Sequence, residues 1–207
     1  MTNKLNKNER GFALPLVLLL LVVMTIMGMT LVTITSNEHK ANTDKDVSQQ
    51  SFYAAESGIA VAKKWMMDNT STLSGSQSNL ETRGLKFCKA SFFPNLKTAT
   101  GFHFDSKSLN QVISASGDEA KRLSKFSFEY FITYSPNSSG VPTIKTKTVA
   151  STEGSSVTQG TAYKSAATSS ATYYTIYSCG CNNTASSCRA QNNIIIPLEA
   201  VVTLVKE

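Results

Sequence analysis

The sequence FALPLVLLLLVVMTIMGMTLV, residues 12–32, determines how this chain is organised. It contains no charged residue, whereas the short polar segment before it carries Lys4, Lys7 and Arg10. An α-helix rises about 1.5 Å per residue, so this stretch is about 31 Å long, close to the hydrocarbon thickness of a bilayer. Basic residues beside a membrane helix favour the cytoplasmic side. We therefore expect one membrane-spanning helix, with the C-terminal bulk of the chain outside the cytoplasm.

Two other kinds of N-terminal segment share this hydrophobicity. A secretory signal peptide has an apolar region of about 7–15 residues followed by a small-residue cleavage site. The present stretch is longer, and the sequence TLVTITSNEH at residues 30–39 offers no such site. An ordinary transmembrane anchor has the same pattern, and periodicity alone does not exclude it. The residues at the start of the stretch, Arg10-Gly11-Phe12, favour a third interpretation.

The helical pattern continues beyond the apolar stretch. Residues 33–69 contain no proline and a single glycine, and residues 38–50 are polar. Apolar residues then recur at intervals of three or four: Phe52, Ala55, Ile59, Ala62 and Met66, with Trp65 adjoining. Such spacing is typical of an amphipathic helix. We expect residues 33–69 to extend the membrane helix and to pack on a sheet through Phe52, Ala55, Gly58, Ile59 and Ala62.

The junction Arg10-Gly11-Phe12, followed by the apolar stretch, resembles the type III signal of prepilins. The resemblance implies that a prepilin peptidase cuts between Gly11 and Phe12 on the cytoplasmic side, and that the new N-terminal Phe12 is methylated. Residues 1–11 would then be a leader peptide. Such a cut removes the basic leader and leaves the apolar helix, which keeps the subunit in the membrane until it enters a fibre.

A second resemblance lies in the helix that follows. Ala41-Asn42, Asp44 and the sequence SFYAAESGIAVA at residues 51–62 look like the N-terminal region of PilX-type minor pilins. Similar sequences occur in the K-type minor pseudopilins of type II secretion. Together with the signal, the resemblance covers about the first 65 residues.

One position departs from the usual pilin pattern. Most pilins carry glutamate at the fifth residue of the mature chain, and here that position is Leu16. The family's glutamate is held to neutralise the N-terminal amine of a neighbouring subunit, and a carboxylate in lipid is costly without such a partner. A subunit with Leu16 has no carboxylate that could pair with the N-terminal amine of a subunit above it in the fibre. We therefore expect a position at or near the fibre tip.

The resemblance also implies partners and locations. The partners would be the major pilin, other minor pilins, the prepilin peptidase and the inner-membrane assembly platform, with a tip adhesin as a further candidate. Before assembly the protein would be a single-pass inner-membrane protein with a periplasmic C-terminus, and after assembly part of an extracellular pilus. We expect a minor pilin that primes pilus assembly. The alternatives are a minor pseudopilin of type II secretion, or a pilus-tip adhesin or DNA-binding subunit.

Strand signals dominate residues 70–207, which we expect to form a globular β-rich head. The strand candidates are residues 124–134, 143–150, 172–178 and 194–205. The turn-forming residues 136–140 predict an antiparallel hairpin between the first two candidates. Pro197 predicts an edge or a bulge in the last one. Strands that follow one long helix indicate an α+β fold, with the C-terminal half of the helix across an antiparallel sheet, as in pilins.

Other parts of the head are less regular. Small polar residues predict a linker or long loop at residues 70–84 and an exposed variable loop at residues 151–171. Asp118 and Glu119 predict the surface of a helix or turn. A further short strand is a candidate around four aromatic residues, Phe92, Phe93, Phe102 and Phe104.

The chain has four cysteines, all after the apolar stretch: Cys88, Cys179, Cys181 and Cys188. In an oxidising compartment they should pair, and four cysteines allow three pairings. A bridge between Cys179 and Cys181 would close a very tight ring. We therefore expect one of these two to bond Cys188 and the other to bond Cys88. A zinc site is the alternative, but one C-x-C with a third cysteine and no nearby histidine is a weak zinc pattern.

Charge and motifs argue against several classes of function. The formal net charge is +6, and removal of residues 1–11 takes away three cations and one anion, leaving +4. The lysines are scattered and form no stripe with stacking aromatics, so nucleic-acid binding is not favoured. Neither His39 nor His103 lies in a nucleophile motif, and the glycines form no phosphate-binding loop. We expect no catalytic residue, no cofactor and no metal, and a structural role in assembly.

Overall fold

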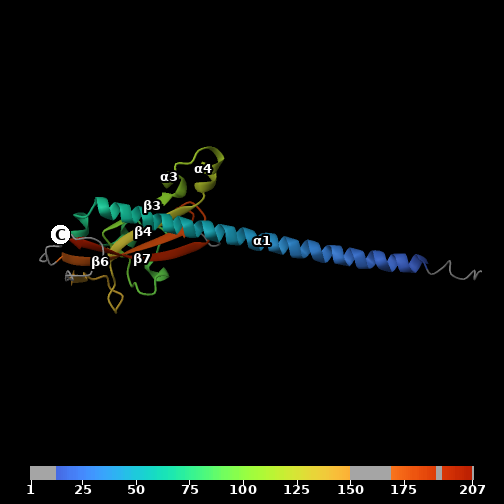
Figure 1. The fold of residues 1–207 in the computed structure, drawn as a ribbon, viewed down its shortest axis with the longest axis horizontal. Helices are drawn as coiled ribbons and strands as arrows, with labels where there is room; N and C mark the ends of the chain where they lie inside the picture. The colour runs from blue at the N-terminus through green and yellow to red at the C-terminus, as the bar shows by residue number, and fades with distance from the viewer. Residues whose placement is uncertain (1–12, 150–168, 190–192, 207) are drawn as a thin grey trace, which may run out of the picture. The chain divides into compact units, whose positions relative to one another are not determined.

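The computed structural model describes residues 13–149, 169–189 and 193–206. Its elements in chain order are α1 (Ala13–Asp68), η1 (Thr72–Ser74), β1 (Ser78–Asn79), α2 (Leu80–Arg83), η2 (Ala90–Phe92), β2 (Thr100–Gly101), β3 (His103–Ser108), α3 (Leu109–Val112), α4 (Gly117–Leu123), β4 (Ser127–Tyr134), β5 (Thr146–Val149), β6 (Ser169–Cys181) and β7 (Ile195–Lys206). A long N-terminal helix packed on an antiparallel sheet confirms the predicted α+β class (Figure 1). The chain divides into two units, Met1–Asp46 and Val47–Glu207, and α1 contributes to both.

In the first unit, every described side chain of α1 is exposed. Pro15 lies in the first turn, where its missing N–H removes no helical hydrogen bond. Thr25, Thr30 and Thr33 each donate their hydroxyl proton to the backbone carbonyl three residues earlier, at 2.8 Å. These bonds keep the hydroxyl groups paired along an otherwise apolar surface, as a helix in lipid requires.

The second unit is built on a five-stranded antiparallel sheet with β6 at its centre. β7 pairs with one edge of β6 over its whole length, from Ser170 opposite Lys206 to Cys181 opposite Ile195. β4 and β5 pair with the other edge of β6, and β3 pairs with β4. β4 pairs with the second half of β6, and β5 pairs with the first four residues of β6. β4 and β5 therefore lie end to end.

The predicted hairpin between the first two strand candidates is wrong, although both strands are present. β4 and β5 run in the same direction along β6 instead of pairing with each other. The turn between them does form, because the Asn137 side chain accepts two backbone N–H bonds from residues 139 and 141. Thr143 then donates its N–H to the carbonyl of Ser135, which brings the chain back to the end of β4. Residues 136–145 thus form a loop that interrupts what is otherwise one long line of pairing along β6. The turn residues predict that the chain reverses, but not which strand the next segment pairs with.

The other strand candidates are confirmed with shifted ends. β6 also includes residues 169–171, which we expected in a loop, and the remainder of that expected loop lies outside the described residues. Pro197 lies in the edge strand β7, whose register with β6 is continuous and without a bulge. Phe104 belongs to β3, whereas Phe92 and Phe93 lie at the end of η2. The expected linker at residues 70–84 contains three short elements, η1, β1 and α2.

The C-terminal part of α1 packs on one face of the sheet through small side chains. Its buried residues are Ser51, Ala54, Ala55, Gly58, Ala62 and Met66. A methyl group on Gly180 of β6 would overlap the Ser51 carbonyl oxygen, and one on Gly58 would overlap Ser178 Oγ. Ser178 Oγ donates a hydrogen bond to the Ala55 carbonyl oxygen at 2.7 Å. The helix therefore rests almost directly on the backbone of β6.

Phe52 lies outside this contact, contrary to our expectation. Ala55, Gly58 and Ala62 are buried in it, and Ile59 is half-buried against the same core. Phe52 is 42% exposed. The helix can approach the sheet closely only where its side chains are small, so the large ring of Phe52 is displaced to the flank.

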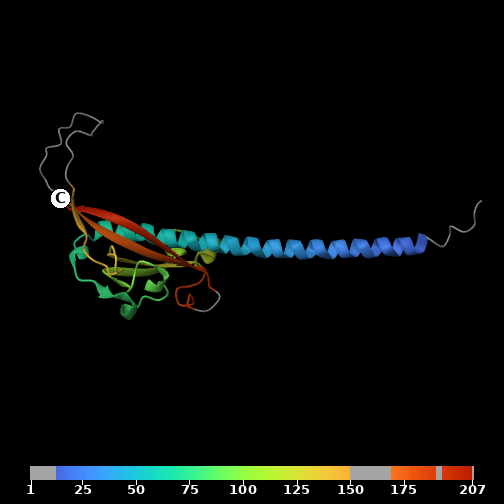
Figure 2. The same ribbon diagram turned by 90° about the horizontal axis from the view of Figure 1, so that it is seen from below.

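Residues 80–99 cover the opposite face of the sheet (Figure 2). Their buried side chains, which include Phe87 and Phe93, pack against Phe131 and Tyr177. On the α1 face the core contains Met66, Phe128, Tyr130, Ile132, Tyr134 and Ile176. β4 contributes to both cores, and all eight of its residues are buried.

The close approach of α1 to β6 makes a specific prediction for Gly180→Ala. The added methyl group would overlap backbone atoms of Ser51 and Ala55, which cannot turn aside as a flexible side chain can. We expect the free energy of unfolding to fall by about 1–3 kcal/mol or more. Urea unfolding of the detergent-solubilised chain, followed by circular dichroism, measures this change. Gly28→Ala is the matched control and should not lower stability, because nothing lies within 4 Å of its added methyl group.

Candidate functional site

α1 presents a long apolar surface that other described residues leave uncovered. Its large hydrophobic side chains between Leu14 and Ile34 are 41–71% exposed. The helix is long and apolar enough to cross a membrane. Soluble monomers rarely expose a contiguous apolar patch beyond a few hundred Å². This surface therefore requires either lipid or other apolar helices around it.

The residues of the predicted processing signal are only partly described. Gly11 and Phe12, where we expect cleavage and methylation, lie outside the described residues. Leu16 lies on the apolar surface and is 51% exposed. The first acidic residue after it in the sequence is Glu38. The described apolar part of α1 therefore offers no carboxylate to a neighbouring amine.

In the head, a buried carboxylate holds the segment that follows α2. Glu129 of β4 is fully buried, and its two oxygens accept the backbone N–H groups of Lys86, Phe87 and Cys88 at 2.7–2.8 Å. Burial raises the pKa of the Glu129 carboxyl, and the three N–H donors oppose that shift. Backbone N–H groups that converge in this way form a site for an anionic oxygen. Glu129 thus ties residues 86–88 to the sheet.

Two disulfides join the same region. Cys88 bonds Cys179, with 5.4 Å between their Cα atoms, and Cys181 bonds Cys188, with 6.2 Å. This is one of the two pairings that the sequence leaves open. Cys179 lies opposite Glu129 in the pairing of β4 with β6. The first disulfide and the buried carboxylate therefore fasten neighbouring points of one segment to neighbouring strands.

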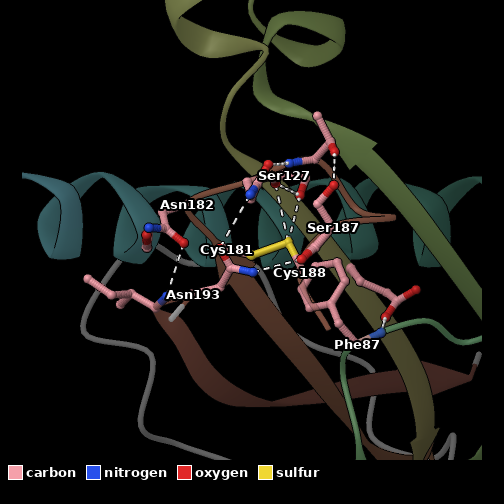
Figure 3. Close-up of a disulfide and its surroundings, with 12 residues drawn as sticks. Phe87, Ser127, Cys181, Asn182, Ser187, Cys188 and Asn193 are labelled. Atoms are coloured by element: carbon pink, nitrogen blue, oxygen red, sulfur yellow. Dashed lines mark hydrogen bonds between the residues drawn. A yellow bond between two sulfur atoms is a disulfide. The ribbon is translucent and has the colours of Figure 1, made fainter. Parts of the chain in front are cut away.

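The second disulfide closes a small loop between β6 and β7 (Figure 3). Asn193 donates a side-chain hydrogen bond to the Ser187 carbonyl oxygen at 2.7 Å, and the Asn182 side chain accepts the N–H of Ile194 at 3.0 Å. Ser127 Oγ, at the start of β4, donates to the carbonyl of Asn183. The loop is held by side-chain bonds as well as by sulfur, and all four cysteines are oxidised.

A stacked aromatic pair joins α1 to the edge of the sheet. The rings of Trp65 and His103 lie 4.0 Å apart and within 4° of parallel. Burial lowers the pKa of His103; Asp105 acts in the opposite direction, while Lys107 and Arg83 lower it further. His103 Nε2 has no hydrogen-bond partner within the described part of the chain. The neutral ring is therefore the favoured form in this contact.

The polar residues that the sequence singled out do not converge on one point. His39 is exposed on the helix of the first unit, and Asp118 and Glu119 lie in the first turn of α4, where they pair with Lys121 and Arg122. Within the described ranges, no three or more His, Cys, Asp or Glu side chains are grouped so that they could hold a metal ion. What the described residues offer to a partner is an apolar helical surface and a cross-linked head.

Sequence reasoning missed two of these contacts. Glu129 is the only charged residue in the strand SFEYFITY, and a charge in a strand of such residues signals a buried polar partner. The pattern could therefore have identified Glu129, but not residues 86–88 as its partners. The stack of Trp65 on His103 joins residues far apart in the sequence, and nothing in either segment links them.

No protein-family model, curated protein or solved structure matches this chain. Its function is therefore inferred from the sequence patterns and from the geometry of the helix and the head.

The Glu129 contacts predict that Glu129→Gln destabilises the head. The amide group would place N–H donors against backbone N–H groups and leave at least one of them without an acceptor. We expect a loss of about 1–3 kcal/mol in the free energy of unfolding, measured by urea titration. Glu81→Gln is the control, since Glu81 is exposed in α2 and its replacement should cost less than about 0.5 kcal/mol. If Glu129→Gln and Glu81→Gln were equally stable, the contacts of Glu129 with residues 86–88 would not stabilise the head.

The stack of Trp65 on His103 predicts a pH dependence. The folded pKa of His103 lies below its unfolded value of about 6.5, so the unfolded chain binds the proton more readily. Stability should therefore be lost as the pH falls from about 6.5 through the folded pKa. The chain has a single tryptophan, so its fluorescence reports this contact and should be quenched with a midpoint below pH 6.5.

Two histidine variants separate this titration from the rest of the molecule. His103→Gln should abolish the fluorescence transition. It should also remove the contribution of His103 to the pH dependence of the melting temperature. His39→Gln should leave both unchanged, because His39 is exposed in the first unit. A transition that persists in His103→Gln would assign the effect to another group.

Proposed function

We propose that this chain is a minor pilin, a low-copy subunit that its apolar helix anchors in a bacterial inner membrane and later inserts into a type IV pilus. The observation that carries the proposal is the uncovered apolar surface of α1. The same helix continues to Asp68, where its small side chains pack on the sheet. One element thus serves both as the anchor and as a structural part of the head.

The proposed mechanism is an exchange of lipid for protein around the helix. Burial of one large aliphatic side chain is worth about 1.5–3 kcal/mol, so exposure of the whole segment to water would cost on the order of tens of kcal/mol. The subunit can leave the membrane only if apolar helices of neighbouring subunits replace the lipid as it leaves. This exchange keeps the apolar segment out of water and requires no change in the folded head.

The processing steps follow from the junction at Gly11. A prepilin peptidase would remove residues 1–11, which carry a net charge of +2, and leave the apolar segment intact. The mature chain would begin at Phe12, which would be methylated. This cleavage distinguishes a fibre subunit from an ordinary membrane anchor, which keeps its N-terminal flank.

Leu16 supports a position at or near the fibre tip. A carboxylate at this position would need an amine from the next subunit to offset its burial in an apolar bundle. Leucine has no such requirement, so nothing needs to lie above it. With other minor pilins, the chain would prime assembly on the inner-membrane platform and would then be carried outward ahead of the major pilin.

The decisive experiment has two readouts in the native host. Mass analysis of the mature N-terminus should find methylated Phe12, and sheared fibres should contain the protein. Val22→Lys should lower its incorporation at least tenfold, because an ammonium group in the helix bundle has no partner in this segment. Val141→Lys is the matched control, at an exposed valine of the head, and should assemble normally.

The outcomes are distinct. An intact leader and absence from every fibre would refute the proposal. Recovery with a secretion pseudopilus would assign the chain to the related class of minor pseudopilins. Immunogold labelling along the whole shaft would refute the tip position alone.

A further inference from the structure

β7 is the longest of the three edge strands of the sheet, with twelve residues against six in β3 and four in β5. Within the described residues, only β6 pairs with it. Residues of an antiparallel strand direct their backbone groups alternately toward and away from a neighbour. Asn182 donates its N–H to the Ile194 carbonyl, which assigns the even-numbered residues of β7 to the bonds with β6.

The odd-numbered residues of β7 therefore direct their N–H and C=O groups outward. Tyr173 confirms this alternation, because it lies opposite Thr203 but exchanges its backbone bonds with Ser135 and Lys145 on the other side of β6. Pro197 fits the same rule. It is odd-numbered, so its missing N–H belongs to the outward row and costs the sheet no bond.

The side chains of β7 also alternate. Its even-numbered residues Leu198, Ala200, Val202 and Leu204 form a half-buried apolar row, and Val202 and Leu204 touch the core on the α1 face. Its odd-numbered residues Glu199, Val201 and Thr203 are exposed on the opposite face. The outer edge of β7 thus combines a row of outward backbone groups with an apolar strip on one side.

Of the other two edge strands, β5 is only four residues long, and β3 is closed by its own side chains. Leu109 donates its N–H to Phe126, so the even-numbered residues of β3 are the outward ones. The outward N–H of Ser106 already bonds the Asp105 side chain at 2.8 Å, and that of Ser108 bonds the Gln111 side chain at 3.2 Å.

An ion pair at 2.7 Å between Lys107 and Asp105 adds charge to this edge. Charges and short length are how natural sheets prevent unwanted strand pairing. β3 has both protections. Residues 195–205 of β7 carry a single charge, that of Glu199.

We propose that the outer edge of β7 pairs with an extended strand of a different subunit of the same fibre. The inference rests on the proposed function. A backbone whose outward groups have no partner among the described residues, with an apolar strip on one face, suits a β-strand with apolar residues at alternate positions. That strand would continue the sheet beyond β7 and cover the apolar row on the α1 face.

A second copy of this chain does not suit this edge. Ser51 of α1 contacts Gly180 of β6, which pairs with Ile196 of β7. Ala55, further along α1, bonds Ser178 of β6, which pairs with Leu198, further along β7. α1 and β7 therefore run in the same direction. Two copies that paired β7 with β7 in antiparallel fashion would run their α1 helices in opposite directions. Subunits of one fibre run in the same direction. Of the other two edges of a second copy, β3 is closed and β5 is only four residues long.

The row on the α1 face also indicates which side chain the partner strand brings. Ala200 is the smallest residue of the row and lies between Leu198 and Val202. A large apolar side chain opposite Ala200 would fill the space beside it, because cross-strand pairs pack in direct contact. On the other face, a basic residue opposite Glu199 would complement its charge.

The test replaces one outward N–H and leaves the bonds with β6 in place. Val201→Pro removes that donor at an odd-numbered position, as Pro197 already does in the natural chain. Val201→Thr is the matched control, because it keeps the N–H and changes the side chain. Both variants are expressed as full-length chains in the native host and measured in sheared fibres by quantitative mass spectrometry.

We expect Val201→Pro to melt within a few degrees of the unmodified chain in detergent, to form both disulfides, and to enter fibres at least tenfold less. Val201→Thr should enter fibres within twofold of the unmodified chain. Hydrogen exchange at the outward N–H groups of Glu199, Val201 and Thr203 should be at least tenfold slower in fibres than in the detergent-solubilised protein.

Each contrary result has its own meaning. Normal incorporation of Val201→Pro would overturn this inference and leave the proposed function intact. Equal loss in Val201→Thr would assign the contact to the side chain. Slow exchange at Glu199, Val201 and Thr203 in the detergent-solubilised monomer would show that the edge is covered within one copy. A detergent-stable dimer that Val201→Pro dissociates would assign the edge to a second copy. Absence of the unmodified chain from fibres would remove the proposed function, and this inference with it.

Discussion

The close contact between α1 and β6 is the constraint on which the rest of the head depends. Gly58 and Gly180 have no side chain, so the helix backbone can approach the strand backbone until Ser178 bonds the Ala55 carbonyl oxygen. Larger residues at either position would lift the helix from the sheet. Phe128, Tyr130 and Ile132 would then lose their cover on one face. The apolar N-terminal part of α1 belongs to the same continuous helix, so this contact also joins the membrane-compatible segment to a folded domain.

β4 shows why the second layer needs cross-links. Both of its faces are buried, one under α1 and the other under residues 80–99, and that second cover contains only short helical elements. A cover with so little regular structure has few backbone bonds of its own. Glu129 supplies three acceptor contacts, and the bridge from Cys88 to Cys179 adds a covalent one. A buried carboxylate is costly in general. Here its oxygens accept the N–H groups of residues 86–88, which a neighbouring strand would otherwise accept.

The sequence predicted what depends on local periodicity and failed where distant segments meet. The apolar stretch, the long helix and the four strands were predictable because each carries its own pattern. The exchange of partners around β6 was not predictable, since residues 136–140 encode a turn whether or not the flanking strands pair. The displacement of Phe52 follows from residue size, because small side chains mark a close contact and large ones mark its edge. The Glu129 contacts could be suspected from one charge in an apolar strand, whereas the stack of Trp65 on His103 could not.

The order of the cysteines along the chain has a consequence for how the head matures. The two bridges join the first cysteine to the second and the third to the fourth, so no bridge crosses another in sequence. A chain that enters an oxidising compartment from its N-terminal side meets each native partner as the next cysteine to arrive. Oxidation in order of arrival would therefore give the final pairs directly, without a reshuffling enzyme. The second bridge joins cysteines seven positions apart and can close locally, whereas the first must wait until Cys179, 91 positions after Cys88, is delivered. The first bridge would therefore depend on delivery of residues 89–179 as well as on thiol chemistry.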